Sequence, residues 1–310
     1  MISVVGEALV DLVIDPSGGV TASLGGAPFN TARACGRLGA EVAFVGALST
    51  DRFGTMLRHR LVEDAVDVTR SSVVEAPTTL AAAELDEGGS ATYRFYVDGT
   101  SAPRLGPIEA GPGVASGSTD VVVTGGLAFV LEPMATSVLA MVESLPESTL
   151  VVVDVNCRPL VIGDRAAYLR QVRRALGRAN VIKVSEEDLE YLDGGTDPVV
   201  AARRLVPSGR PGVVLVTGGA AGSTIVTGDG LVVGVPVVPV DVVDTIGAGD
   251  TFTGAFVSWW VSHGLGVAES ADVVSVERAV AAASIAAGVA CTRRGAEPPY
   301  RHELPDDWDR

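Results

Sequence analysis

A nine-residue stretch near the C-terminus, "DTIGAGDTF" at 244–252, places two glycines and an aspartate where an extended apolar run gives way to a helical pattern. The first N–H groups of a helix have no partner within it, and the helix dipole makes that end positive. Glycine lets the backbone approach a ligand closely, so Gly247, Ala248 and Gly249 have the chemistry of a phosphate-binding turn. The alternative is an ordinary tight turn between a strand (236–243) and a helix.

Asp250 directly follows these glycines and admits two interpretations. An acid in the first turn of a helix stabilises it by up to about 1 kcal/mol, which is a common structural role. A carboxylate beside a bound phosphate is unfavourable unless it takes part in the reaction. In phosphoryl transfer it takes the proton of the attacking hydroxyl as a general base. The local pattern alone leaves both interpretations open.

Two other nucleotide-binding motifs are excluded at this position. A dinucleotide fingerprint needs GxGxxG, but the third glycine counted from Gly247 falls at Phe252. A Walker A loop needs Gly-Lys-Ser/Thr, whereas the only lysine of the chain, Lys183, follows Ile182. A dehydrogenase is therefore disfavoured, and the glycine turn is best interpreted as an anion hole at a helix N-terminus.

The composition restricts the partners and the compartment. The net charge is −15, and the resulting acidic surface repels nucleic acid and anionic membranes, so we expect neither as a partner. The three cysteines are far apart and no CxxC occurs, which indicates reduced thiols and a cytoplasmic protein. The N-terminus "MISVVGEALV" lacks a basic region and predicts a first strand. The uncharged run 251–268 predicts a buried core helix.

Short apolar runs that end in Gly, Asn or Ser alternate with helical patterns along the chain, as in "DVVVTGG", "LVVVDVN" and "GVVLVTGG". Such runs suit parallel strands that are buried on both faces. The alternation predicts one α/β domain over 1–310, with a doubly wound, mostly parallel sheet flanked by helices. The helices expected after the first hundred residues are 133–145, 165–178, 185–193, 198–206, 249–264 and 275–290.

Two regions of the N-terminal third break this alternation. Pro-Ser-Gly-Gly and Gly-Gly turns separate extended stretches at 10–26 and 77–100, which predicts two hairpins. Together they can form a small β-sheet that serves as a lid over a ligand cleft, or they are surface decoration. Exposed edges of such a lid can pair between subunits, so a homodimer through the lid is expected.

The glycine stretch resembles the C-terminal signature of the PfkB, or ribokinase-like, carbohydrate kinases. "GGAPFNTARACGRLG" at 25–39 resembles the N-terminal glycine motif of the same family. Further similar segments follow in the family's order, and the resemblance spans essentially the whole chain; they are "STDRFG" at 49–54, "VIKVSEEDLEYL" at 181–192, "VTGGAAGS" at 216–223 and "CTRRGAEP" at 291–298. The resemblance implies a ribokinase-like fold and ATP-dependent phosphorylation of a primary hydroxyl on a small sugar.

The resemblance also implies roles for individual residues. Asp250 would be the catalytic base, and Gly247, Ala248 and Gly249 would hold the transferred phosphoryl group, with Mg²⁺ bridging the phosphates of ATP. The sugar would be bound by residues of the N-terminal third and of "DVNCRP", namely Asp11, Gly25, Gly26, Asn30, Asn156 and Arg158. The ATP side would use Lys183, Ser185, Thr217, Gly219 and Gly222. A monovalent cation, K⁺ in particular, would bind beside Asp244 and the carbonyl of Ile246.

Two departures bear on this assignment. Ribokinases carry Asn-x-x-Glu where this chain has Ser185 to Asp188, which weakens a metal-linked role for Asp188. They also carry a lysine in the N-terminal motif, whereas Ala27 and Pro28 here are similar to fructokinases. The resemblance therefore implies fructose, with 2-keto-3-deoxygluconate and ribose as alternatives. A non-catalytic sugar-binding regulator is a further alternative, although Asp11 and Asp250 are both present.

Overall fold

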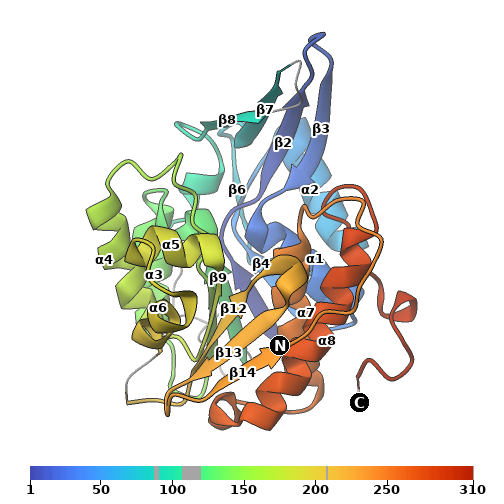
Figure 1. The fold of residues 1–310 in the computed structure, drawn as a ribbon. Coiled ribbons are helices and arrows are strands. Elements are labelled where there is room, and N and C mark those ends of the chain that lie inside the picture. Colours follow the sequence, from blue (N-terminus) through green and yellow to red (C-terminus); the bar gives the residue numbers. More distant parts are fainter. Residues whose placement is uncertain (87–90, 107–119, 207–208, 310) are drawn as a thin grey trace.

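The computed structural model describes residues 1–310 apart from 87–90, 107–119, 207–208 and 310. Its centre is a sheet of eight strands in the order β14-β13-β12-β11-β10-β9-β1-β4 (Figure 1). The strands from β4 to β12 are parallel to their neighbours, and β13 and β14 add an antiparallel edge. The strands span Ile2–Val5 (β1), Val42–Val45 (β4), Val121–Gly125 (β9), Leu150–Asp154 (β10), Val181–Ser185 (β11), Val213–Thr217 (β12), Ser223–Thr227 (β13) and Val232–Val235 (β14). The predicted α/β, mostly parallel sheet is confirmed.

Helices cover both faces of this sheet. Side chains alternate between the faces, so that Val121 and Val123 join one hydrophobic cluster while Val122 joins the other. On the first face lie α1 (Ala27–Arg37), α2 (Arg52–Glu63), α7 (Ala248–Ser262) and α8 (Val273–Cys291). On the second lie α3 (Met134–Ser144), α4 (Arg165–Leu176), α5 (Glu186–Asp193) and α6 (Pro198–Leu205).

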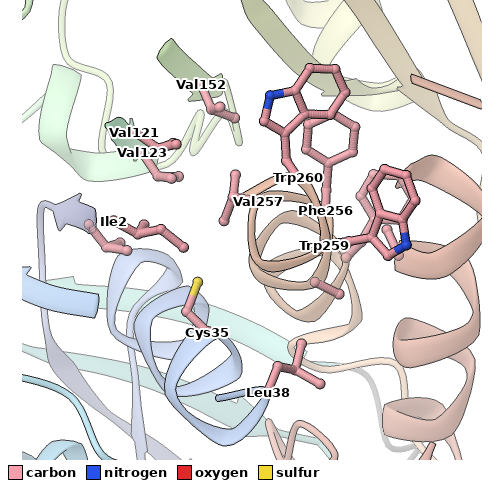
Figure 2. Close-up of a cluster of buried hydrophobic side chains, with 14 of the residues drawn as sticks. Ile2, Cys35, Leu38, Val121, Val123, Val152, Phe256, Val257, Trp259 and Trp260 are labelled. Atoms are coloured by element: carbon pink, nitrogen blue, oxygen red, sulfur yellow. The ribbon is translucent and has the colours of Figure 1, made fainter. Parts of the chain in front are cut away.

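Helices α1 and α7 pack closely within the first cluster, which Figure 2 shows around Trp259 and Trp260. A Cβ on Gly254 would stand 2.6 Å from the Cβ of Ala34 and 2.8 Å from the carbonyl oxygen of Thr31. A larger residue at Gly254 would therefore push the two helices apart. This packing brings the start of α1 and the start of α7 to the same place.

The predicted buried core helix is α7, whose residues from Thr251 to Trp260 are buried. Among the described residues, α8 is the one helix that is long and apolar enough to cross a membrane. It packs on α7, and the indole N–H of Trp308 donates to the carbonyl of Ala282 on it. These contacts are those of a helix in a protein core.

A second sheet has the strand order β3-β2-β7-β8 and lies apart from the main sheet, at the top of Figure 1. Its strands are β2 (Leu9–Ile14), β3 (Val20–Gly25), β7 (Leu80–Leu85) and β8 (Ala91–Tyr96). The two predicted hairpins are present, and a parallel pairing of β2 with β7 joins them. A third, two-stranded sheet pairs β5 (Ala47–Ser49) with β6 (Ser72–Val74).

Two predictions about strands were wrong. The N-terminal run was expected to be one strand, but β1 ends at Val5 and β2 begins at Leu9, so Asp11 lies on the second strand. Gly6 at the break has a φ of 150°. The run 236–243 was also expected to be a strand, yet β14 ends at Val235, and Val243 donates to the carbonyl of Cys291 on α8 instead. Two prolines within this run cannot donate to a ladder.

Candidate active site

The glycine turn forms the N-terminus of α7, approached by an extended loop. Gly247 is the N-cap, in the left-handed region with φ 75°, and no side chain caps the helix. A Cβ on Gly247 would also stand 2.6 Å from the Cβ of Ala296, so only glycine suits both the conformation and the space. The first-turn amides of Gly249 and Asp250 belong to the set that a helix leaves without intrahelical partners. A helix N-terminus of this geometry can bind an anion.

Asp250 lies in the first turn of α7, half-buried and in contact with α1. The side-chain amide of Asn30 donates to its Oδ2 at 2.8 Å. Burial raises the pKa of Asp250 to about 6. The hydrogen bond from Asn30 lowers this pKa, the charge of Asp154 raises it, and the charges of Lys183 and Arg158 lower it. The carboxyl is thus mostly ionised at neutral pH but more basic than an ordinary aspartate. A general base needs both properties.

A buried cation lies beneath the turn. The ammonium of Lys183 is 3.1 Å from the position that a Cβ on Gly249 would take, and 3.1 Å from Oδ1 of Asp154. Burial lowers the pKa of Lys183, but the charges of Asp154, Asp188 and Asp250 outweigh it and the pKa is raised. Lys183 therefore stays protonated beside the N-terminus of α7, paired with Asp154.

Among the residues assigned to the sugar side, Asn30 and Arg158 are linked to Asp250. A Cβ on Gly25 would overlap the Asp11 carboxylate, 2.1 Å from its Oδ2, so the hairpin places these two residues in contact. Burial raises the pKa of Asp11 to about 6, and the charge of Arg158 opposes this. The charge of Arg158 lowers the pKa of both Asp11 and Asp250. Arg158 itself is exposed and lies two residues after Asn156 in the chain. The structure thus brings together both predicted sugar-side segments.

Asn156 follows β10 with a φ of 43°, a rare conformation for a residue other than glycine. Gly26, which precedes α1, has a φ of 107°. A Cβ on Gly26 would stand 2.9 Å from the carbonyl oxygen of Glu7. The backbone of the sugar side therefore contains two residues with positive φ, and the close approach of Glu7 leaves no room for a side chain at Gly26.

The residues assigned to ATP lie at the carboxyl ends of β11 and β12. Ser185 and Thr217 are paired across these strands. Gly219 and Gly222 both have positive φ in a turn closed by a bond from the Gly218 amide to the Gly222 carbonyl. This edge is where ligands gather in open α/β sheets. Apart from Lys183, which lies under Gly249, the ATP-side residues form one group.

Asp188 has a structural role in this edge. It forms a capping box with Ser185 at the start of α5, and its Oδ1 accepts a hydrogen bond of 2.6 Å from the backbone N–H of Cys157. Both carboxylate oxygens of Asp188 therefore have backbone partners.

Asp244 precedes the glycine turn and accepts two backbone bonds, from the amides of Ile246 at 3.0 Å and Gly295 at 2.8 Å. The monovalent-cation site expected there stays a prediction. Within the described part of the chain, no group of three His, Cys, Asp or Glu side chains is arranged to hold a metal ion.

One charged network behind the site was not predicted. Arg33 on α1 is 1% exposed; it donates to Asp64 at 2.7 Å, to the carbonyl of Ala296 at 2.7 Å and to Glu297 at 3.1 Å. Arg37 bonds the same two acids. Because Ala296 lies directly against Gly247, the network fixes the residue behind the glycine turn. The sequence signal that could have revealed this network is the pair Arg33 and Arg37, which lie four residues apart on a helix of mostly small residues.

The arrangement can transfer a phosphoryl group to a hydroxyl. A basic carboxylate stands between a helix N-terminus that suits a phosphate and a pocket of hydrogen-bonding groups that suits a polyol. Positioning and charge stabilisation supply most of the catalysis in such transfers.

Comparisons with known proteins agree with this chemistry. A family model described as "pfkB family carbohydrate kinase" matches residues 1–303. A Klebsiella pneumoniae protein named fructokinase is 32% identical over 305 residues, covering 97% of each chain. The structure of fructokinase with bound ATP from Xylella fastidiosa has a TM-score of 0.86 and 26% identity, over 98% of this chain and 94% of that one. Fructokinase from Vibrio cholerae O395, in fructose, ADP and calcium ion bound form, has a TM-score of 0.80 and 26% identity, over 95% and 94% of the chains.

Proposed function

The chain belongs to the pfkB family of carbohydrate kinases, and on that basis we propose that it transfers the γ-phosphate of ATP to a primary hydroxyl of fructose. The observation that carries the proposal is the hydrogen bond of 2.8 Å from Asn30 to Asp250. It joins the N-terminal glycine motif, which faces the acceptor, to the helix that bears the anion hole. Fructose as acceptor is supported by the relatives named fructokinase and by the fructose and ADP in the V. cholerae structure.

The proposed mechanism uses the residues in this order. Asp11, Asn30 and Arg158 hold the sugar with one hydroxyl directed at Asp250. Asp250 takes the proton of that hydroxyl as its oxygen attacks the γ-phosphorus of ATP. The new P–O bond forms as the bond to ADP breaks, and the amides at the start of α7 stabilise the charge on the transferred group.

ATP enters as its magnesium complex, so the metal arrives with a substrate. Bound to the phosphates, Mg²⁺ neutralises part of their charge. We further propose that a monovalent cation binds beside Asp244 and Ile246, in keeping with the potassium ion in one V. cholerae fructokinase structure. The enzyme is proposed to act in the cytoplasm, with a homodimer through the lid hairpins.

The proposal is tested by ADP release with a panel of sugars that includes fructose, 2-keto-3-deoxygluconate and ribose. We expect fructose to give the highest kcat/KM. A higher value for another sugar would contradict the assignment of fructose alone. Binding of a sugar without ADP release from any of them would support the regulator instead.

The pH dependence of the reaction should follow the ionisation of Asp250. Its pKa is raised from 3.8 to about 6, and the ionised form is the base, so kcat should rise with pH through about 6 and then level off. The measurement is kcat with saturating fructose and ATP between about pH 5 and about pH 8. Asp11→Asn is the control, because Asp11 has a similar pKa and acts on sugar binding. If the rise of kcat near pH 6 disappeared in Asp11→Asn, the ionisation that controls the rate would belong to Asp11 rather than to Asp250.

A further inference from the structure

Glu7 lies on the connection between β1 and β2, is 3% exposed and has no place in the mechanism above. Its Oε1 is 3.2 Å from the position that a Cβ on Gly126 would take. The side-chain nitrogen of Asn156 is 3.8 Å from the same point, and the Cβ of Ala27 is 3.9 Å from it. The carboxyl therefore lies where the start of α1, the turn after β9 and the segment after β10 meet.

The carboxyl of Glu7 also acts on the N-terminus of α1. The N-cap of this helix is Gly26, which has no side chain to accept hydrogen bonds from the first backbone N–H groups of α1. The backbone N–H of Ala27, the first residue of α1, lies close enough to the carboxyl of Glu7 to lower its pKa. An oxygen acceptor at this position is favourable for a helix. Glu7 thus brings a carboxyl from another element to a helix end whose N-cap has no side chain.

The charge of Glu7 is adjusted by its surroundings. Burial raises its pKa to about 7, while its own amide, Arg158 and the Ala27 amide lower the pKa and Asp250 raises it. None of the described residues forms a hydrogen bond with its buried Oε2. Near neutral pH a large fraction of the carboxyl is therefore protonated, with one oxygen free to carry the proton and the other free to accept. A glutamine side chain offers the same donor and acceptor.

We propose that Glu7 is a positioning residue for sugar phosphorylation, which fixes the first turn of α1 against the turn that carries Asn156. The inference rests on the proposed function, since the elements it joins are the two that bind the acceptor. Gly25, Gly26 and Asn30 move with the start of α1. Loosening that turn misplaces the sugar groups while it leaves the ATP side of the sheet unchanged.

The test compares Glu7→Gln with Glu7→Met. The two new side chains are of similar size, but only glutamine has an oxygen that can accept a hydrogen bond from the Ala27 amide. For Glu7→Met we expect the KM for fructose to rise about tenfold or more, with the KM for ATP within about threefold. Glu7→Gln should restore the KM for fructose to within about threefold of the unchanged enzyme. Glu41→Gln, at an exposed position, is the control. Equal KM values for fructose in the Gln and Met variants would overturn the proposal.

A second measurement separates this inference from the proposed function. Amide hydrogen exchange of the peptide 25–35 should be faster in Glu7→Met than in Glu7→Gln, whichever sugar is the substrate. If the unchanged enzyme phosphorylates none of the sugars, the proposed function fails and the exchange comparison still decides the role of Glu7. Should Glu7→Met not fold, Glu7→Asp replaces it, because its shorter side chain withdraws from Ala27. Equal exchange in the compared variants would contradict the positioning role.

Discussion

Asp250→Asn is expected to lower kcat for fructose phosphorylation by about 10³-fold, because an amide cannot take the proton of the attacking hydroxyl. Asparagine keeps the shape of the side chain and an oxygen that can accept from Asn30, so the contact between α1 and α7 should persist. The thermal unfolding midpoint and the Kd for ATP should change little. The measurements are steady-state kinetics, thermal unfolding and ATP titration on the same preparation.

Asp241→Asn is the matched control for this prediction. It makes the same chemical change at an exposed position nine residues earlier in the chain and should leave kcat unaltered. A rate for Asp250→Asn close to that of the control would mean that the carboxylate is a structural acid in the first turn of α7. The base would then have to be another group.

Arg33→Met is expected to lower the free energy of unfolding by about 3–5 kcal/mol, since it leaves buried acid and carbonyl groups with a missing partner. Arg33 and Asp64 are almost fully buried, with side-chain exposures of 2% and 1%. Activity should also fall, because Ala296 loses the arginine that fixes it and Gly247 loses its backing. Urea unfolding and kcat measure the two effects.

Arg60→Met provides the comparison for this network. Arg60 reaches the same Glu297 at 3.5 Å, but its side chain is 36% exposed. Exposed ion pairs contribute about 0–1 kcal/mol, so this variant should stay within that range. If the two variants lost similar amounts of unfolding free energy, burial would not be the reason why the network stabilises the protein.

The fold was largely predictable because its signals are local. Each parallel strand is a short apolar run, and each run is followed by a helical pattern or a turn residue. The two strand errors arose where local pattern and tertiary structure disagree. Apolar residues on both sides of Gly6 and Glu7 hid the break there, and the valines in 236–243 suggested a strand whose ladder the prolines do not permit.

The candidate active site was predictable only where a sequence motif marked its residues. Asp250 and Asn30 were assigned through two glycine motifs, and their contact links positions 220 residues apart. The network of Arg33 and Glu297 depends on a separation of 264 residues that no periodicity records. Glu7 stood inside a run that was predicted to be a strand, so nothing marked it as buried between three elements. Such groups act through packing, which a single sequence does not encode locally.

Every tryptophan of the chain belongs to one face of the main sheet. Trp259 and Trp260 lie on the helix that begins at the glycine turn, and Trp308 packs on α8 in the same hydrophobic cluster. Tryptophan fluorescence, excited selectively, therefore reports on the layer that holds Asn30 and Asp250, because none of α3, α4, α5 and α6 contains a tryptophan. An unfolding curve recorded by tryptophan emission therefore follows the layer that contains the candidate reaction centre, while partial melting of the opposite layer has to be followed by another signal, such as circular dichroism.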